Sequence, residues 1–365
     1  MPLAPPSDWE PADEISPAPH LPRRAFLLQL TTLAATVGLL PSSAALGWDT
    51  PPPLTLQPRW PMEPSARRRY DYAPRIWRQP SRPVQDYPLS PRPWTEPWTA
   101  ADLNTRVEDY IKDLRQAGRL RPDERTAWLV YDFTSRRFLV KINTSLSYQS
   151  ASMIKPFIAL AFFEKVRQGQ LDYTGFHQQR MEAMIQHSNN HATNYFIDLL
   201  DQTSHRSGPS ETEHTLRRRY PSVFRQTRIV EYIPNTGRTY RNRASALDYH
   251  RFLQALWYDQ LPYADEIRRL MYLPNRDRVY TGARGVPRGT EVIDKTGSTA
   301  RLCGDMGILI AQGRDGRQYP YTFIGIIQKA RPTSNYGPWQ RARGNVIREV
   351  SNMTYAHLRE LYDLV

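Results

Sequence analysis

Apolar side chains recur at helical and strand spacings along residues 100–365, and this alternation predicts a domain that mixes helices and strands. Leu103, Val107, Ile111 and Leu114 lie three or four residues apart, which predicts a helix over 102–117. Short apolar runs bounded by turn residues are typical of strands. We expect strands at 127–131, 138–142, 293–296, 306–310 and 321–326, and further helices at 152–167, 178–187, 190–200, 245–258, 264–271 and 339–362.

The order of these elements predicts the fold class. A helix and two strands come first, several helices follow, and three strands and a helix end the chain. This order fits an α+β fold, an α/β sandwich, in which terminal helices cover one face of a five-stranded antiparallel sheet and helices are inserted between the strands. We expect this domain to span residues 100–365.

The first 47 residues have the layout of an export signal. Arg23 and Arg24 precede an apolar stretch over 25–40, which ends near the small residues 43–45. The paired arginines are typical of the twin-arginine type and predict an exported protein, periplasmic or secreted. The apolar stretch is short and polar for a membrane span, which needs about 20 apolar residues. We expect a cleaved signal and no stable membrane span afterwards, with a retained anchor as the alternative.

Residues 48–99 differ from both flanking segments, because most of the chain's 32 prolines cluster in its first hundred positions. Proline removes backbone donors and disfavours regular helices and central strands. The segment is therefore predicted to be an extended linker or arm. Its tryptophans and tyrosines suggest that parts of it dock on a surface.

The net charge and the cysteine content limit the kinds of partner, disulfide and metal site that we expect. The net charge of +13 indicates either an ordinary basic surface or an anionic partner, such as a cell-wall polymer. Basic residues form no stripe interleaved with aromatic ones, so we expect no nucleic acid partner. Cys303 is the single cysteine, which excludes an intramolecular disulfide. No metal-ligand spacing such as H-E-x-x-H occurs, and we expect neither a metal nor a cofactor.

The first candidate motif is Ser152-Met153-Ile154-Lys155, at the start of a predicted helix. A serine hydroxyl needs a base to become a good nucleophile. Residues three apart share a helix face, so Lys155 lies within reach of Ser152. A desolvated lysine near other cations can lose its proton near neutral pH. By itself this motif occurs by chance in many proteins.

Two further motifs follow along the chain. Ser188-Asn189-Asn190 lies between two predicted helices, where the serine can relay a proton and the asparagine amide can bind an amide of the substrate. An ordinary polar helix cap is the alternative. Lys295-Thr296-Gly297 lies on a predicted strand, where the lysine and the hydroxyl can bind a carboxylate and glycine permits close approach.

Taken together, S-x-x-K, S-x-N and K-T-G resemble the signature of the serine β-lactamases and penicillin-binding proteins, most closely that of class A β-lactamases. This resemblance implies that Ser152 is the nucleophile, Lys155 its base or base partner, and Ser188 a proton relay. It implies that the backbone N–H groups of Ser152 and Ser298 form the oxyanion hole. The implied substrate-binding residues are Asn190, Lys295, Thr296, Gly297 and Ser298.

Several features depart from the class A pattern. That class carries an E-x-x-L-N stretch whose glutamate activates the deacylating water. This chain has Glu231-Tyr232-Ile233-Pro234-Asn235, so Glu231 is either the deacylation base or a loop glutamate. Ser188 follows Ser152 by 36 residues, a short gap that implies a reduced all-helical subdomain.

Three functions remain open from the sequence. The first is a class A-like serine hydrolase that hydrolyses β-lactams or related amides, which would confer antibiotic resistance. The second is a D,D-carboxypeptidase or endopeptidase that acts on peptidoglycan peptides. The third is a non-catalytic relative that binds the cell wall or partner proteins through residues 48–100. Formation of an acyl-enzyme is better supported than rapid hydrolysis, since hydrolysis also needs a positioned water and base.

Overall fold

The structure is a computed structural model that describes residues 102–234 and 240–365. The predicted signal (1–47), the proline-rich arm (48–99) and Asn235 lie outside the described residues. Among those described, no helix is both long and apolar enough to cross a bilayer.

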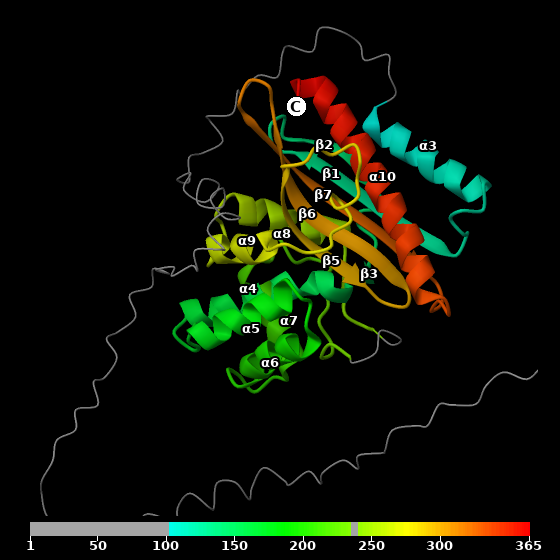
Figure 1. Ribbon diagram of the computed structural model, residues 1–365. Helices are drawn as coiled ribbons and strands as arrows, with labels where there is room; N and C mark the ends of the chain where they lie inside the picture. The colour runs from blue at the N-terminus through cyan, green and yellow to red at the C-terminus, as the bar shows by residue number, and fades with distance from the viewer. Residues whose placement is uncertain (1–101, 235–239) are drawn as a thin grey trace, which may run out of the picture. The chain divides into compact units, whose positions relative to one another are not determined.

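A five-stranded antiparallel sheet forms the centre of the described domain, as the sequence predicts (Figure 1). The strand order is β2-β1-β7-β6-β5, so β5 lies at one edge. The five strands are β1 (Glu124–Asp132), β2 (Arg137–Ile142), β5 (Glu291–Ser298), β6 (Leu302–Gln312) and β7 (Gln318–Lys329). A separate pair joins β3 (Tyr148–Gln149) to β4 (Arg243–Ala244).

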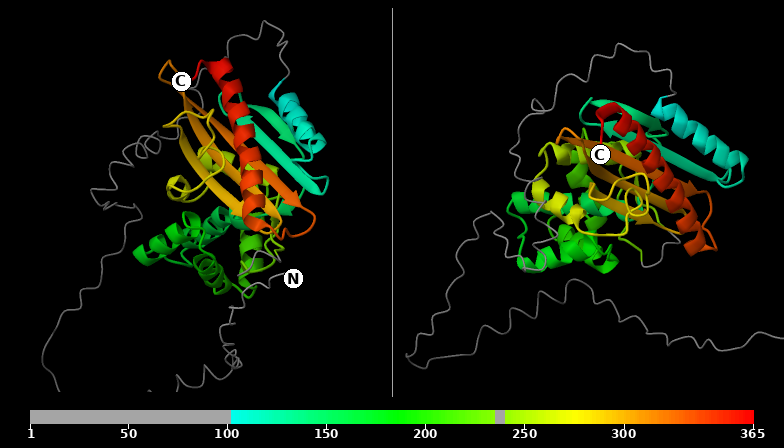
Figure 2. Two further views of the ribbon diagram at one scale, coloured as in Figure 1. Left: turned by 45° about the vertical axis from the view of Figure 1, so that its right-hand side comes forward. Right: turned by 45° about the horizontal axis from the view of Figure 1, so that its top comes forward.

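The terminal helices α3 (Leu103–Gln116) and α10 (Tyr336–Tyr362) lie on the same face of the sheet (Figure 2). The predicted apolar stripe of α3 is buried in a core that includes side chains of β1, β6, β7 and α10. Glu124 of β1 accepts hydrogen bonds from Trp339 and Arg343 of α10, all three of them buried, so a charged pair also fixes this helix to the sheet.

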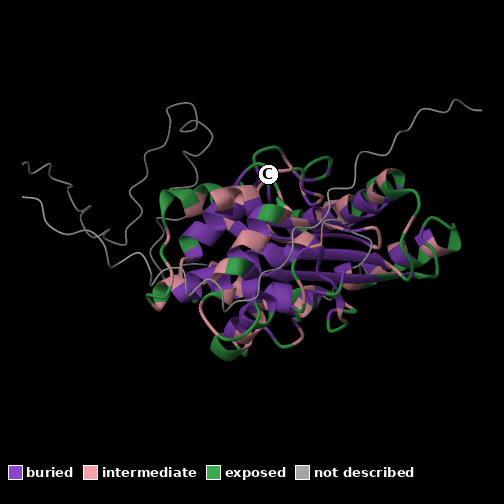
Figure 3. Cartoon of the chain, turned by 90° about the horizontal axis from the view of Figure 1, so that it is seen from below, coloured by how far each residue is buried: buried purple, intermediate pink, exposed green. Residues whose placement is uncertain are grey.

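The other face carries α8 (Ala246–Trp257) and the helical part of the domain. That part contains α4 (Lys155–Arg167), α5 (Gly175–Ile185), α6 (Asn190–Asp201), α7 (Gly208–Arg219) and α9 (Ala264–Tyr272). Residues 155–165 of α4 are all buried, and a helix that is buried all round belongs at the centre of its domain. Figure 3 shows that buried residues fill the interior of the described part of the chain and that exposed ones lie at its periphery. The predicted α+β fold with inserted helices is confirmed.

Two predictions about helices were incomplete. The helix expected from Ser152 is divided: residues 151–154 form a 3-10 helix, η2 (Ala151–Ile154), and the α-helix begins at Lys155. Helix α7 was not predicted at all. Its sequence is mostly polar, with Leu216 its one large aliphatic side chain, so no apolar periodicity marks it.

Candidate active site

The backbone around Ser152 is held in an unusual conformation. Ala151 has φ of +48°, in the left-handed region that residues other than glycine seldom adopt. The Tyr240 hydroxyl donates a hydrogen bond of 2.7 Å to the carbonyl oxygen of Ala151 and lies 3.2 Å from the Ser150 hydroxyl. Such conformations persist where surrounding contacts fix them, and here a buried tyrosine supplies the contact.

Lys155 is fully buried at the start of α4. Burial and, secondarily, the positive charge of Lys295 lower the pKa of Lys155 to about 6. Its Nζ donates to the backbone oxygen of Ser188 and to Asn190 Oδ1 at 2.9 Å, and it lies 3.4 Å from the Ser188 hydroxyl. The structure therefore brings the first and second motifs together around one amine.

The second motif serves both as a helix cap and as part of the site. Asn189 caps α6, since its side chain accepts from the backbone N–H of Ala192 at 2.9 Å. Ser188 has φ of +57°, and its carbonyl oxygen accepts from the Lys155 amine. The two readings of this motif thus apply to different residues: Asn189 caps the helix, whereas Ser188 and Asn190 contact Lys155.

The third motif lies against the serine turn. A Cβ atom added at Gly297 would lie 2.9 Å from Met153 Cγ, closer than packed atoms allow, and 3.1 Å from Ala151 Cβ, a tight contact. Glycine is therefore required for β5 to approach η2 this closely. The structure thus places the K-T-G strand beside the Ser-x-x-Lys turn.

Lys295 is buried on β5 beside two carboxyl groups. Burial lowers the pKa of Lys295 to about 8, against the opposing charges of Asp294 and Asp305. Burial raises the pKa of Asp305 to about 7 and that of Asp294 well above its usual range. The charge of Asp277 adds to both shifts, and that of Asp305 adds to the shift of Asp294. The Nζ of Lys295 makes a weak 3.3 Å contact with the carbonyl oxygen of Thr296.

Arg278 is a site residue that no motif in the sequence predicts. Its guanidinium donates to the Ser298 hydroxyl at 2.6 Å and to the Gly304 carbonyl at 3.0 Å, and its charge contributes to the lowered pKa of Lys295. It comes from the loop before β5, where no motif or periodicity distinguishes it from neighbouring arginines. Together with Lys295 it adds positive charge next to the K-T-G strand.

The described side-chain contacts of Glu231 join it to Arg241 and not to Lys155. Its two carboxylate oxygens accept from the backbone N–H and the Nε of Arg241, each at 2.6 Å. The following residues approach the site instead: Asn194 binds both the N–H and the carbonyl of Ile233, and the Asn190 amide lies 3.5 Å from the Pro234 oxygen. In the described contacts, this loop presents Ile233 and Pro234, not Glu231, to the site.

The antiparallel sheet, the Ser-x-x-Lys turn with its buried lysine and the adjoining K-T-G strand are those of the serine β-lactamase and penicillin-binding-protein superfamily. Comparison with known sequences agrees, because the sequence model of the Beta-lactamase enzyme family matches residues 106–175 and 177–358. The chain therefore belongs to the Beta-lactamase enzyme family. A comparison with curated proteins gave no match.

The matches to solved structures of this fold extend over nearly the whole length of each solved chain. PBP-A is 20% identical, with a TM-score of 0.56 over 73% of this chain and 98% of its own. An ancestral (GNCA) class A β-lactamase is 18% identical, with a TM-score of 0.54 over 69% and 99%. A β-lactamase from Streptosporangium roseum is 15% identical, with a TM-score of 0.54 over 70% and 98%. At these identities the likeness shows the fold alone.

Proposed function

We propose that this chain is a serine hydrolase that forms an acyl-enzyme on Ser152 with β-lactams and with amides of the cell-wall peptide type. The environment of Lys155 carries the proposal. A neutral amine has two N–H donors and one lone pair. Ser188 O and Asn190 Oδ1 accept from this amine, which leaves the lone pair to accept a hydroxyl proton.

The chemistry follows from this arrangement. The Ser152 oxygen attacks the carbonyl carbon while its proton passes to the Lys155 amine. The C–N bond then breaks, and the proton reaches the leaving nitrogen through the Ser188 hydroxyl, which lies 3.4 Å from Nζ. Backbone N–H groups of Ser152 and Ser298 are proposed to stabilise the oxyanion.

Substrate recognition is assigned to the strand side of the site. Lys295 and Arg278 supply positive charge, and Thr296 and Ser298 supply hydroxyl groups for a substrate carboxylate. Asn190 retains an amide donor whose described contact, with Pro234, is 3.5 Å long, so this group is suited to a carbonyl of the substrate. We therefore expect substrates with a carboxylate near the scissile amide.

The position of Glu231 favours slow deacylation over rapid β-lactam hydrolysis. Its carboxylate is paired with Arg241, and no described contact joins it to Ser152 or Lys155, so we propose that it does not activate water at the Ser152 ester. This contact favours the second candidate function, a penicillin-sensitive D,D-peptidase that acts on peptidoglycan peptides. A cell-wall location of the protein, after export, forms part of this proposal.

Covalent labelling tests the proposal. We expect a fluorescent penicillin to label the chain in equimolar amount, and Ser152→Ala to abolish labelling. Ser334→Ala, in an exposed loop, is the matched control and should label normally. Absence of labelling in the unaltered chain, or retention in Ser152→Ala, would establish the non-catalytic alternative or another nucleophile.

Turnover separates the two enzymatic candidates. A D,D-peptidase releases D-alanine from a D-Ala-D-Ala peptide and turns over a chromogenic cephalosporin slowly, with the labelled form persisting. Fast cephalosporin turnover without accumulation of the acyl-enzyme would instead support the class A-like β-lactamase function.

A further inference from the structure

A hollow of about 630 Å³ lies along helix α7, outside the residues assigned to acyl transfer. Its lining includes Arg206, Arg217 and Arg218, with the single carboxylate of Glu213. Ile229 and Val230 form its apolar wall. We call this feature the α7 hollow.

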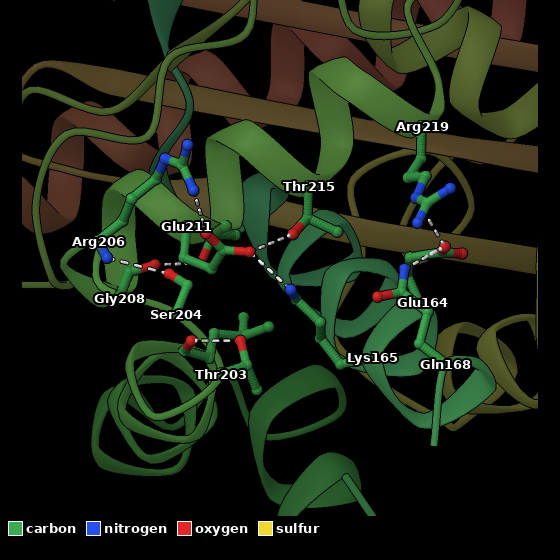
Figure 4. Close-up of polar contacts among 12 residues, drawn as sticks. Glu164, Lys165, Gln168, Thr203, Ser204, Arg206, Gly208, Glu211, Thr215 and Arg219 are labelled. Atoms are coloured by element: carbon green, nitrogen blue, oxygen red, sulfur yellow. Dashed lines mark hydrogen bonds and ion pairs between the residues drawn. The ribbon is translucent and has the colours of Figure 1, made fainter. Parts of the chain in front are cut away.

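The carboxylates at the hollow are already neutralised by neighbouring cations. Buried Lys165 pairs with Glu211 at 2.6 Å, and Arg206 reaches the same carboxylate at 3.4 Å (Figure 4). Glu213 pairs with Arg228 at 2.8 Å and with Arg217 at 3.3 Å.

These contacts leave an excess of positive charge at the α7 hollow. Glu211 is shared by Arg206 and the buried Lys165, and Glu213 is shared by Arg217 and Arg228. Arg218 is exposed and has no ion pair among the described residues. With Arg218, these four cations make five positive charges against two carboxylates, a net charge of +3 for the lining of the hollow and its ion-pair partners together.

The polar groups follow one face of α7. Ser207, Ser210, His214 and Arg217 all line the hollow, and their spacing of three or four residues places them in a row. Ser207 makes no side-chain capping bond at the helix start, so its hydroxyl is available to a ligand. A helix of 12 residues is about 18 Å long, so the row can contact several repeating units.

We infer that the α7 hollow binds a linear polyanion through oxyanions, carboxylate or phosphodiester, that repeat along its chain. Guanidinium groups bind both kinds of oxyanion through paired hydrogen bonds. Excess charge on a face already rich in cations favours a ligand with several negative charges over a single anion. A polymer of the bacterial cell wall has this chemistry, and the partner class, though not the site geometry, rests on the proposed function.

The lining argues against a nucleic acid as the polyanion. Proteins that bind single strands combine positive charge with aromatic side chains that stack on the bases. The residues that line the α7 hollow include no phenylalanine, tyrosine or tryptophan. A polymer without bases therefore fits the site better.

Calorimetric titration of the full chain tests the inference with three probes: poly-L-glutamate, short-chain inorganic polyphosphate and a single-stranded oligonucleotide. Tighter binding of poly-L-glutamate identifies carboxylates as the ligand groups, and tighter binding of polyphosphate identifies phosphates. In either case the affinity should fall as salt is added. Failure of both to bind, or tighter binding of the oligonucleotide, would overturn the inference.

A charge-matched pair of variants locates the site. Arg206→Gln with Arg218→Gln should weaken binding by about tenfold or more, because each lost guanidinium contact to an oxyanion is worth about that much. Arg314→Gln with Arg317→Gln removes the same charge from the exposed β6–β7 turn and should change affinity by about twofold or less. Equal losses in both pairs would show non-specific attraction and reject the site.

Two further measurements keep the result interpretable. Thermal unfolding of each pair shows whether the variants fold, and Arg218→Gln alone retains every described ion pair of the cluster. The titration is repeated in Ser152→Ala, where binding should be unchanged. Absence of penicillin labelling in the unaltered chain would refute the acyl-enzyme proposal, whereas it would leave polyanion binding at the α7 hollow untouched.

Discussion

The protonation state of Lys155 sets the pH dependence of acylation. Acylation requires the neutral amine, because only that form has a lone pair for the proton of Ser152. With a pKa of about 6, about nine tenths of Lys155 is neutral at pH 7. A lysine with the ordinary pKa near 10.4 would be neutral in about one molecule in 3000 at that pH.

The same arithmetic gives the size of the effect. The neutral fraction of Lys155 falls from about nine tenths at pH 7 to about one tenth at pH 5, so acylation should slow about tenfold. At high pH a second limb should appear near pH 8, where Lys295 loses the proton that lets it bind a carboxylate. Stopped-flow rates of penicillin acylation between pH 5 and 9 measure both limbs.

Removing the charge of Lys295 tests whether that charge contributes to the lowered pKa of Lys155. Lys295→Gln should move the acid limb to higher pH, since the charge of Lys295 favours the neutral form of Lys155. Rates are compared after scaling to the plateau of each variant, because Lys295 also binds substrate. Lys141→Gln, at an exposed position, is the control and should leave the limb unmoved. A rate that does not change between pH 5 and 7 would refute the assignment of Lys155 as the neutral base.

Three further substitutions test other parts of the site. Tyr240→Phe removes the hydrogen bond to Ala151, so we expect slower acylation in a stopped-flow assay and a loss of about 1 kcal/mol of stability in denaturant titrations. Gly297→Ala should cost about 1–3 kcal/mol through overpacking and should slow labelling, whereas Gly175→Ala, where the added Cβ meets no atom, should do neither. Glu231→Gln should leave the lifetime of the penicillin adduct within about twofold, a result that a large increase in lifetime would contradict.

Most of the fold follows from the sequence because most elements bury an apolar side. The apolar side chains of α3, β6 and β7 are buried in a core, and burial on one side of an element makes apolar residues recur at the spacing of that element. Helix α7 is an exception, because its sequence has no apolar periodicity. It is attached through the buried pair Lys165–Glu211, and such a contact between distant positions leaves no periodic signal in the sequence.

At the site, the sequence predicts only those contacts that join residues close together along the chain. The Ser-x-x-Lys spacing predicts that Lys155 lies one turn from Ser152, and this holds although Ser152 belongs to η2 and Lys155 begins α4. Tyr240 and Arg278 reach the site from loops far along the chain, and only the packed structure shows these contacts. Glu231 shows the converse, because a motif spacing suggested a role that its pairing with Arg241 does not support.

Burial of Lys155 explains why the three motifs must occur together. A buried amine without partners would be costly even when neutral, so its N–H groups need acceptors. Ser188 and Asn190 provide them, and the left-handed conformation of Ser188 directs its carbonyl toward the amine. The positive charge of Lys295 also disfavours protonation of Lys155. Each motif alone is common in proteins, but a lysine that is buried, bonded through two acceptors and repelled by a second lysine is suited to remove a proton from Ser152.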